Sequence, residues 1–319
     1  MCGCGECDAC HTVRAGTHAD VTVVAPEGLS YGVAEARQLV RSISDAPVRG
    51  RWRVVIVEDA DRLTEQAGNA LLRAIEEPPP RAVFMLCAPT IEDVLPTVRS
   101  RCRHVTLRIP SSAAVAEVLV RRDHIDPAMA AFAARAAQGH VGRARRLATD
   151  EEARRRRRDV LDLPTELDGV GSAIAAAAAL VDAASEDAAA VTDALDARET
   201  TAMREALGDT GRGVPRGSAA ALNDLERRQK SRATRSKRDL LDNALLDLAA
   251  LYRDVLVVQM GADVELVNAD LSDLVTKLAR GSRPADTLRR IEAVMACRQA
   301  VDENVNPLLA VEALALALR

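Results

Sequence analysis

Residues 53–61 read RVVIVEDAD, and this stretch decides the fold. The run from Val54 to Val57 is short, continuous and β-branched, which is typical of a strand buried on both faces of a parallel sheet. It ends on two carboxylates, Glu58 and Asp59. Because open α/β sheets bind their ligands beyond the carboxyl ends of the strands, this acidic pair is a candidate binding site.

Strands and helices alternate on both sides of this run. Downstream, apolar residues recur at helical spacing from Ala67 to Ile75, behind an N-cap predicted at Thr64. Three consecutive prolines then end the helix, and residues 82–88 read as a second buried strand. Upstream, residues 21–24 predict a strand and residues 33–43 the helix that follows it.

Five short segments follow one another in an order that resembles the AAA+ clamp-loader family, and most of all its delta-prime subunits from the bacterial DNA polymerase III clamp loader. They are EDAD (58–61), NALL (69–72), EEPP (76–79), LP (95–96) and RSRC (99–102). Each segment alone is weak, but the ordered set within 50 residues is specific. The resemblance implies an α/β AAA+-type parallel sheet core, a helical lid domain and an all-α collar domain.

Family members carry a phosphate loop, G-x-x-x-x-G-K-[ST], ahead of a zinc module, and no segment of residues 1–319 matches that pattern. The glycine-rich stretch 208–217 is followed by Ala/Leu-rich sequence and predicts a loop instead. We therefore expect an N-terminally incomplete core, whether through a misassigned start, a fragment or a natural short form. By resemblance, Glu58 and Asp59 would be a degenerate, inactive version of the family's magnesium-binding acidic pair, and this chain alone should hydrolyse no ATP.

The composition predicts a mostly helical protein without a nucleic-acid-reading surface. Hydrophobic residues make up 48% of the chain and aromatic residues only 2%, so the core is expected to be Ala, Leu and Val packed between helices. Few aromatic side chains are present to stack on bases. The net charge of -4 neither favours nor excludes contact with nucleic acid. No apolar run of 18 residues is present, which predicts a cytoplasmic protein with no membrane partner.

Four of the seven cysteines lie in the first ten residues. Cys4, Cys7 and Cys10 have the two-residue spacings that let a turn gather thiolates around a structural Zn²⁺. The site needs a fourth ligand, for which Cys2 and His11 are the candidates, unless that ligand lies upstream of Met1 as it does in the family. The alternative is that these are ordinary reduced thiols at a frayed end.

Pro110 marks the end of the predicted core, which gives domains of 1–109, 110–163 and 164–319. Three helices are expected in the lid, the first capped at Ser111 or Ser112 and the second at Asp126. Gly142 stands where active family ATPases place a sensing arginine, and Arg143 is one residue further along. Beyond residue 164 the sequence is helical and Ala/Leu-rich, with long helical patterns at 223–258, 271–279, 288–301 and 307–318.

The arginine run at residues 154–158 has two interpretations. A solvated helix end is the plainer one, because cations are favourable near a helix C-terminus. Contact with DNA phosphates is the sharper alternative.

Three functions fit these observations to different degrees. A non-catalytic, delta-prime-like clamp-loader subunit fits best. An active AAA+ ATPase of the same loader, similar to its gamma/tau subunit, needs a phosphate loop and a polar sensor where this chain has Cys87. A free-standing zinc-bearing nucleic-acid-binding protein needs stacking aromatics. The first interpretation implies gamma/tau-like and delta-like partners, and contact with the sliding clamp and primed DNA through the complex. The chain would belong to a DNA polymerase holoenzyme, a nucleotidyltransferase, without adding nucleotides itself.

Arg101 is the residue to which the resemblance assigns chemistry. It is expected after a short helix opened by Pro96, at the start of a further strand, where its side chain can reach ATP bound by a neighbouring subunit. A planar guanidinium suits this role because charge spreads over the γ-phosphoryl oxygens during transfer. Arg99 and Arg103 are the competing arginines, and an ion pair with a surface carboxylate of the same domain is the alternative role for Arg101.

Overall fold

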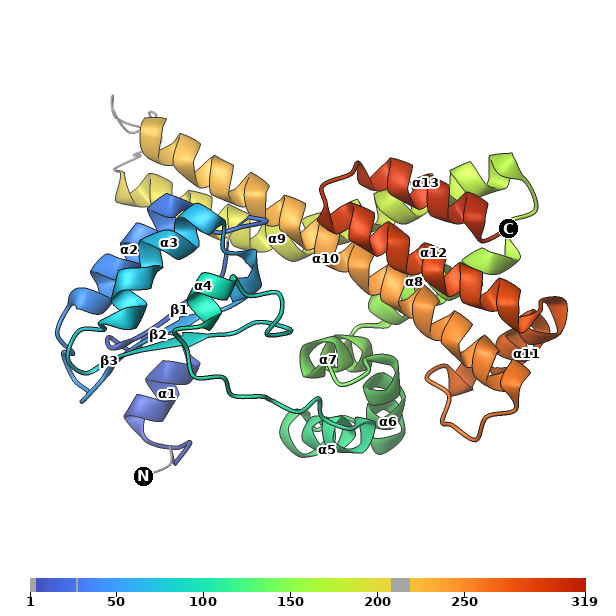
Figure 1. The fold of residues 1–319 in the computed structure, drawn as a ribbon, viewed down its shortest axis with the longest axis horizontal. Helices are drawn as coiled ribbons and strands as arrows, with labels where there is room; N and C mark the ends of the chain where they lie inside the picture. The colour runs from blue at the N-terminus through green and yellow to red at the C-terminus, as the bar shows by residue number, and fades with distance from the viewer. Residues whose placement is uncertain (1–3, 27, 208–218) are drawn as a thin grey trace. The chain divides into compact units, whose positions relative to one another are not determined.

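The computed structural model describes residues 4–26, 28–207 and 219–319 (Figure 1). The chain forms two compact units, one of residues 1–106 and 198–235, the other of residues 107–197 and 236–319. Cys2 and the whole glycine-rich stretch 208–217 lie outside the described residues. Within those residues, no helix is both long and apolar enough to cross a membrane.

The first unit is built on a three-stranded parallel sheet in the order β1-β2-β3. The strands are β1 (Val21–Val24), β2 (Arg53–Val57) and β3 (Ala82–Leu86). Val54 of β2 lies opposite Val21 on one side and Val83 on the other. The β-branched run therefore forms the central strand, as the sequence predicts. Its burial alternates, however, and only Val55 and Val57 are completely buried, so the prediction of burial on both faces is right for one face.

Helices α2 (Val33–Ser44) and α3 (Glu65–Glu76) cover that buried face and pack against each other. Thr64 caps α3 as predicted, its side chain accepting a hydrogen bond from the Ala67 N–H at 3.2 Å. The unit also contains α1 (Asp8–Arg14), a short 3₁₀ turn η1 (Ala60–Arg62) and α4 (Pro96–Arg99). Leu39, Ile43 and Leu71 join the two strand valines in one apolar core.

The strand expected after Cys102 does not form. Residues 103–110 have no regular structure, and Val105, Leu107 and Ile109 expose most of their side chains. Their alternating apolar pattern suits a strand, but a strand is stable only when a neighbour pairs with its backbone. In the described part of the chain β3 pairs with β2 alone, and residues 103–110 have no pairing partner. The prediction was wrong because sequence periodicity carries no information about that neighbour.

The second unit begins with a three-helix cluster. It consists of α5 (Ser112–Asp123), α6 (Pro127–Ala136) and α7 (Val141–Thr149), which share an alanine-rich core. Ser111 and Asp126 cap the first two helices as predicted, and the His140 side chain caps the third. These caps satisfy backbone N–H groups that the first turn of a helix leaves without partners.

Six further helical elements and two long helices complete the described part. They are α8 (Glu151–Asp162), η2 (Leu163–Thr165), α9 (Val170–Ala206), α10 (Ala219–Met260), η3 (Ala269–Leu271), α11 (Ser272–Gly281), α12 (Pro284–Asp302) and α13 (Pro307–Ala317). Residues of α8, α9, α10, α12 and α13 share a large aliphatic core within the second unit. The end of α9 and the start of α10 belong to the first unit. A parallel-sheet core followed by helical domains is therefore the observed architecture, while the division at residues 109 and 163 remains a prediction.

Candidate functional site

Arg101 lies in a turn that directly follows α4. Pro96 opens that short helix, Val98 anchors it in the interior, and the Arg101 N–H donates to the Val98 carbonyl at 3.1 Å. The side chain is 35% exposed. The turn therefore holds the backbone of Arg101 and leaves part of its guanidinium at the surface.

Two of the three guanidinium nitrogens of Arg101 are engaged within its own unit. Its Nε donates to Oε1 of Glu76, and its Nη1 donates to the Thr97 carbonyl at 2.9 Å and to the Ser100 hydroxyl at 3.2 Å. The ion pair expected as the alternative to the trans role is thus present in this chain. Nη2 has no hydrogen bond or ion pair among the described residues, so this nitrogen stays available.

The two competing arginines are placed differently. Arg99 makes a long contact of 3.4 Å from Nη1 to the Ile91 carbonyl. Arg103 is exposed in the irregular segment after the turn and has no ion pair within the described residues. Neither is anchored like Arg101, whose Nε and Nη1 both donate to acceptors of the backbone or of side chains.

The acidic pair lies at the carboxyl end of β2, as predicted, but its two carboxylates differ. Glu58 is exposed, whereas Asp59 is half-buried and sits in the left-handed backbone region with φ of 49°. Asp59 forms an ion pair with Arg235 of α10, which also donates to the Pro26 carbonyl. Tyr31 lies beside this site, with its hydroxyl 2.6 Å from the Glu58 carbonyl oxygen.

One carboxylate of the predicted acidic pair is therefore paired with a guanidinium of the same chain. This partner was missed from the sequence because Arg235 lies 176 positions away in a helix. The basic segment 227–238 was visible, but nothing in its spacing singles out one arginine. Burial and the nearby Asp59 raise the pKa of Tyr31 above its usual value, which keeps its hydroxyl protonated as a hydrogen-bond donor.

Cys4, Cys7 and Cys10 come together at the start of α1. Their sulfur atoms lie within 4.8 Å of one another, close to the spacing of thiolates that share one Zn²⁺. His11 is not part of this group, since adjacent helix residues point about 100° apart. The suggestion that His11 completes the site is therefore not supported, and Cys2 lies outside the described residues.

The chemistry of these thiols suits a cation. Backbone N–H groups of Glu6 and Cys7 lower the pKa of the Cys4 thiol to about 7. The pKa of Cys7 is raised instead: the backbone N–H of Cys10 lowers it, but the sulfurs of Cys4 and Cys10 oppose a second negative charge. Three thiolates at this spacing repel one another, and a bound divalent ion would remove that repulsion.

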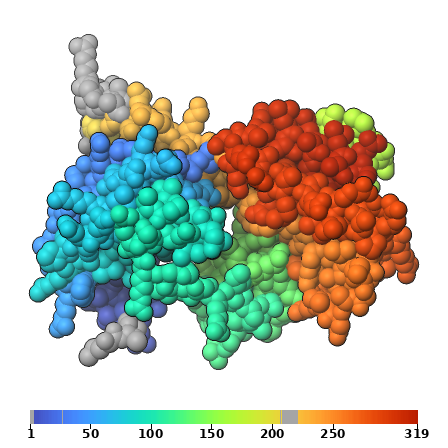
Figure 2. All heavy atoms as spheres, viewed as in Figure 1, coloured from blue at the N-terminus to red at the C-terminus, as the bar shows by residue number. Residues whose placement is uncertain are grey.

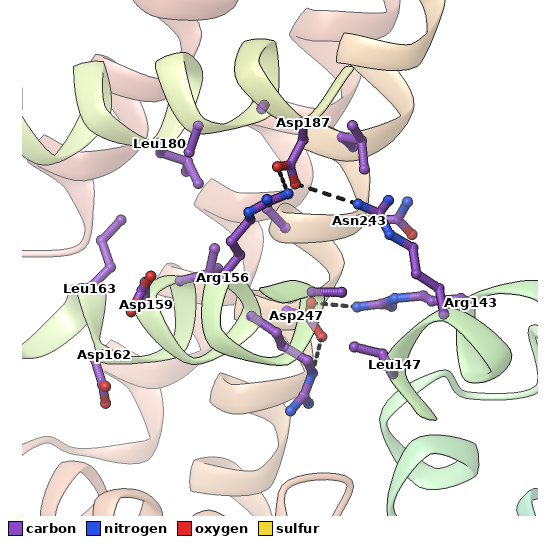
Figure 3. Close-up of a pocket in the computed structure, with 18 of the residues that line it drawn as sticks. Arg143, Leu147, Arg156, Asp159, Asp162, Leu163, Leu180, Asp187, Asn243 and Asp247 are labelled. Atoms are coloured by element: carbon purple, nitrogen blue, oxygen red, sulfur yellow. Dashed lines mark hydrogen bonds and ion pairs between the residues drawn. The ribbon is translucent and has the colours of Figure 1, made fainter. Parts of the chain in front are cut away.

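The arginine run of α8 is engaged inside the second unit. Arg157 is buried, and its Nε donates to Asp247 of α10 at 2.9 Å while its Nη2 donates to Asn268 at 2.5 Å. Asp247 also accepts from Arg143 of α7 (Figure 3). Arg143, one residue along from Gly142, is thus engaged by α10 within the second unit.

The rest of the run is paired as well. Arg154 donates to carbonyls at the end of α7, Arg155 pairs with Glu152, and Arg156 pairs with Asp187 of α9. Arg158 lies 4.0 Å from Asp270. The run lies within α8 rather than at its end, so the helix-end interpretation was wrong. Arg155 and Arg158 keep 67% and 59% of their side chains exposed, and contact with DNA phosphates stays a prediction.

The ion pairs of Asp187 and Asp247 line a cavity of about 590 Å³ between α7, α8, α9 and α10 (Figure 3). Leu163 and Leu180 are among its apolar lining residues. Its acidic lining residues balance its arginines, so the cavity has no surplus of positive charge that would favour an anion. The arginines are Arg143, Arg146, Arg156 and Arg157, and the acidic residues are Asp159, Asp162, Glu166, Asp187 and Asp247.

Two family models match the two ends of the chain. Residues 1–111 match the family model described as "DNA polymerase III, delta subunit", and residues 236–319 match "DNA polymerase III, delta subunit, C terminal". A DNA polymerase III subunit delta' from Pseudomonas aeruginosa is 37% identical over 40% of this chain and 39% of its own length. The subunit delta' of Escherichia coli K12 is 41% identical over 31% of this chain and 30% of its own.

Two further proteins that are similar to this chain are gamma-type subunits or related to them. A DNA polymerase III subunit gamma/tau from Mycobacterium tuberculosis H37Rv is 35% identical over 37% of this chain and 21% of its own. The solved gamma subunit-related protein from Thermotoga maritima aligns over 94% of this chain and 83% of its own at 17% identity, with a TM-score of 0.43, too weak a likeness to extend the argument. The matched segments thus span well under two thirds of the curated relatives.

A parallel-sheet core with an acidic pair and an arginine turn, followed by helical domains, agrees with the AAA+-type architecture expected from the sequence. Residues 1–111 and 236–319 each match a model of the DNA polymerase III delta subunit. The curated relatives at 34–41% identity make the chain delta-prime-like.

Proposed function

We propose that this protein is a non-catalytic, delta-prime-like subunit of a DNA polymerase III clamp loader. In this role it helps to assemble the ATP-driven ring that loads a sliding clamp onto primed DNA. Its partners would be gamma/tau-like and delta-like subunits, with the clamp and the DNA reached through the complex in the cytoplasm. Neighbouring subunits would bind the ATP, and this chain would not.

The observation that carries the proposal is the state of the two candidate sites. Asp59 is paired with Arg235 of the same chain, so this carboxylate is not free to recruit magnesium. Arg101, in contrast, keeps Nη2 without a partner in the described residues, on a side chain that is partly exposed. An occupied acidic site and an available arginine suit a subunit that serves a neighbour's ATP and lacks its own.

The test is Arg101→Ala in a clamp loader reconstituted with the complete chain. An arginine finger is worth about 10³ to 10⁵ in rate, which corresponds to roughly 4 to 7 kcal/mol of transition-state stabilisation. We expect assembly to persist while DNA-stimulated ATP hydrolysis at one site falls steeply. Arg103→Ala is the matched control, since it removes a nearby exposed charge. Wild-type turnover in the Arg101 variant would leave only the ion-pair role.

A structural Zn²⁺ is the cofactor that we propose for Cys4, Cys7 and Cys10, with Cys2 as the candidate fourth ligand. Such a site holds its metal with four ligands and adds order without chemistry. Metal analysis of the purified protein should return one zinc per chain, and Cys7→Ser should lose it. Cys87→Ser is the control, because this exposed thiol lies outside the cluster. A chain without zinc before and after metal loading would contradict the proposal.

The segment from about 165 to 319 is the proposed collar through which the ring forms. Helix α13 is apolar on nearly all sides, and Leu309 and Leu316 remain exposed on it although Glu312 is its single charged residue. Helices α12 and α13 lie at the surface in the face shown in Figure 2. Leu309→Glu should weaken entry into the ring. Val118→Glu, at an exposed position of α5 outside this segment, is the control, and equal assembly by both variants would count against the collar.

A further inference from the structure

Glu76, the partner of Arg101, occupies an unfavourable position for a carboxylate. It is the last residue of α3, where the unpaired carbonyl groups carry partial negative charge, and Glu77 follows it directly. Two adjacent acidic side chains at a helix C-terminus repel that charge and each other. The Arg101 guanidinium compensates Glu76, while Glu77 is exposed and has no ion pair in the described part of the chain.

The two residues are held by elements that pack closely. Helix α4 lies against α3 at Gly68, where a Cβ atom would come within 2.5 Å of the Leu95 side chain. The completely buried Val98 lies 3.5 Å from the same point. This close approach fixes the end of α4, and with it the Arg101 turn, relative to the end of α3.

The contacts of Arg101 hold two of its three guanidinium nitrogens. Glu76 accepts from Nε, and the Thr97 carbonyl and Ser100 hydroxyl accept from Nη1 at 2.9 and 3.2 Å. Because the Nε and Nη1 hydrogens point to different sides of the planar fork, these acceptors hold it from two directions. A guanidinium held in this way cannot rotate freely about its last bonds, and Nη2 is the nitrogen without a partner among the described residues.

We propose that Glu76 is a positioning residue that orients Arg101, so that Nη2 faces a γ-phosphate bound by the neighbouring subunit. The inference rests on the trans role of Arg101 proposed above. A pre-oriented arginine loses less conformational freedom when it meets the transferring phosphoryl group, and misplacement by about 1 Å costs about 100-fold in rate. Glu76 itself touches no reacting atom.

The experiment measures DNA-stimulated ATP hydrolysis in the reconstituted loader with variants of the complete chain. Glu76→Ala should lower kcat between about 10- and 100-fold, leave KM and ring assembly unchanged, and fall short of the Arg101→Ala loss. Glu76→Gln keeps an oxygen within reach of Nε and should retain most of the activity. Glu76→Asp keeps the charge but shortens the side chain, and it should behave like Glu76→Ala.

Two controls separate orientation from general stability. Glu77→Ala removes the neighbouring carboxylate and should leave kcat unchanged. The double variant Glu76→Ala/Arg101→Ala should be no slower than Arg101→Ala alone, because Glu76 acts only through the arginine.

Each contrary result has a distinct meaning. Wild-type kcat in Glu76→Ala alongside a severe Arg101→Ala loss overturns the positioning role and leaves the proposed function standing. A faster Glu76→Ala loader shows that Glu76 sequesters the arginine, which also overturns it. Wild-type kcat in Arg101→Ala overturns both proposals together.

Discussion

The Arg157–Asp247 pair of the second unit and the Arg101–Glu76 pair of the first use the same two functional groups in opposite surroundings. Arg157 and Asp247 expose 5% of their side chains each, and Asp247 serves a second arginine besides. Arg101 and Glu76 expose 35% and 45%. The buried pair is out of reach of another molecule, whereas the surface pair is accessible to one. Burial, rather than residue type, separates an arginine that holds the fold from one that is available to another molecule.

The largest effect that tests this contrast is expected from Asp247→Ala. The change would leave the buried Arg157 guanidinium without its carboxylate, and breaking a buried pair costs about 3–5 kcal/mol. Urea unfolding followed by circular dichroism measures the loss. Asp242→Ala removes the acceptor of the more exposed Arg298 and is the control, with an expected cost below about 1 kcal/mol. Equal costs for the two variants would contradict the role given to burial.

Asp20 tests how far backbone N–H groups can replace an arginine, since Nη1 of Arg53 approaches its carboxylate only to 4.0 Å. Backbone N–H groups of Val48, Gly50 and Arg49 donate to it and lower its pKa to about 2, from an ordinary value of 3.8. Because the folded pKa is the lower one, the charged carboxylate stabilises the fold above about pH 4, and that contribution is lost as the pH falls toward 2.

Acid titration of the free energy of unfolding should show this loss in the wild type. Asp20→Asn should remove the part of this loss that comes from protonation of the Asp20 carboxylate. If the free energy of unfolding of the variant falls with acid as steeply as that of the wild type, other groups cause the loss.

Arg235→Ala should lower the free energy of unfolding by less than Asp247→Ala or Asp20→Asn does. The Arg235–Asp59 pair is partly exposed, at 20% and 33%, so we expect a loss of about 1 kcal/mol. Hydrogen exchange should increase at the start of α10 and around Asp59. Arg227→Ala, on the exposed face of the same helix, should leave both regions unchanged, and similar exchange in the two variants would argue against a specific contact.

The smallest effect on stability is expected from Arg101→Ala, at or below about 1 kcal/mol, since an exposed ion pair contributes little. The same substitution is predicted to reduce turnover by orders of magnitude. Denaturant unfolding of the isolated chain, compared with turnover in the loader, measures both quantities. A loss of several kcal/mol would identify Arg101 as a residue that holds the fold, like Arg157.

The local elements were predictable from sequence, and the ion pairs between them were not. Thr64, Asp126 and the prolines mark helix ends through contacts within a few residues, so the sequence contains the relevant partners. Arg157 and Asp247 lie 90 positions apart, and either could have paired with many other charges. The strand expected after Cys102 failed for the same reason, because its formation depends on a distant neighbour. The grouping of Cys4, Cys7 and Cys10 was predictable from their spacing alone, whereas a fourth ligand was not.

The scarcity of aromatic residues has a consequence for spectroscopy. Trp52 is the chain's one tryptophan, lies two residues from Gly50 in the loop that holds Asp20, and is 54% exposed. Its emission therefore reports on the first unit alone. Trp52 also lies close to Asp20, whose protonation is predicted to destabilise that unit. Tyr252 is buried in the second unit, with the Arg290 guanidinium carbon 5.8 Å from its ring centre. Selective excitation of Trp52, compared with the helical circular dichroism of the whole chain, can follow the unfolding of the sheet without any added label.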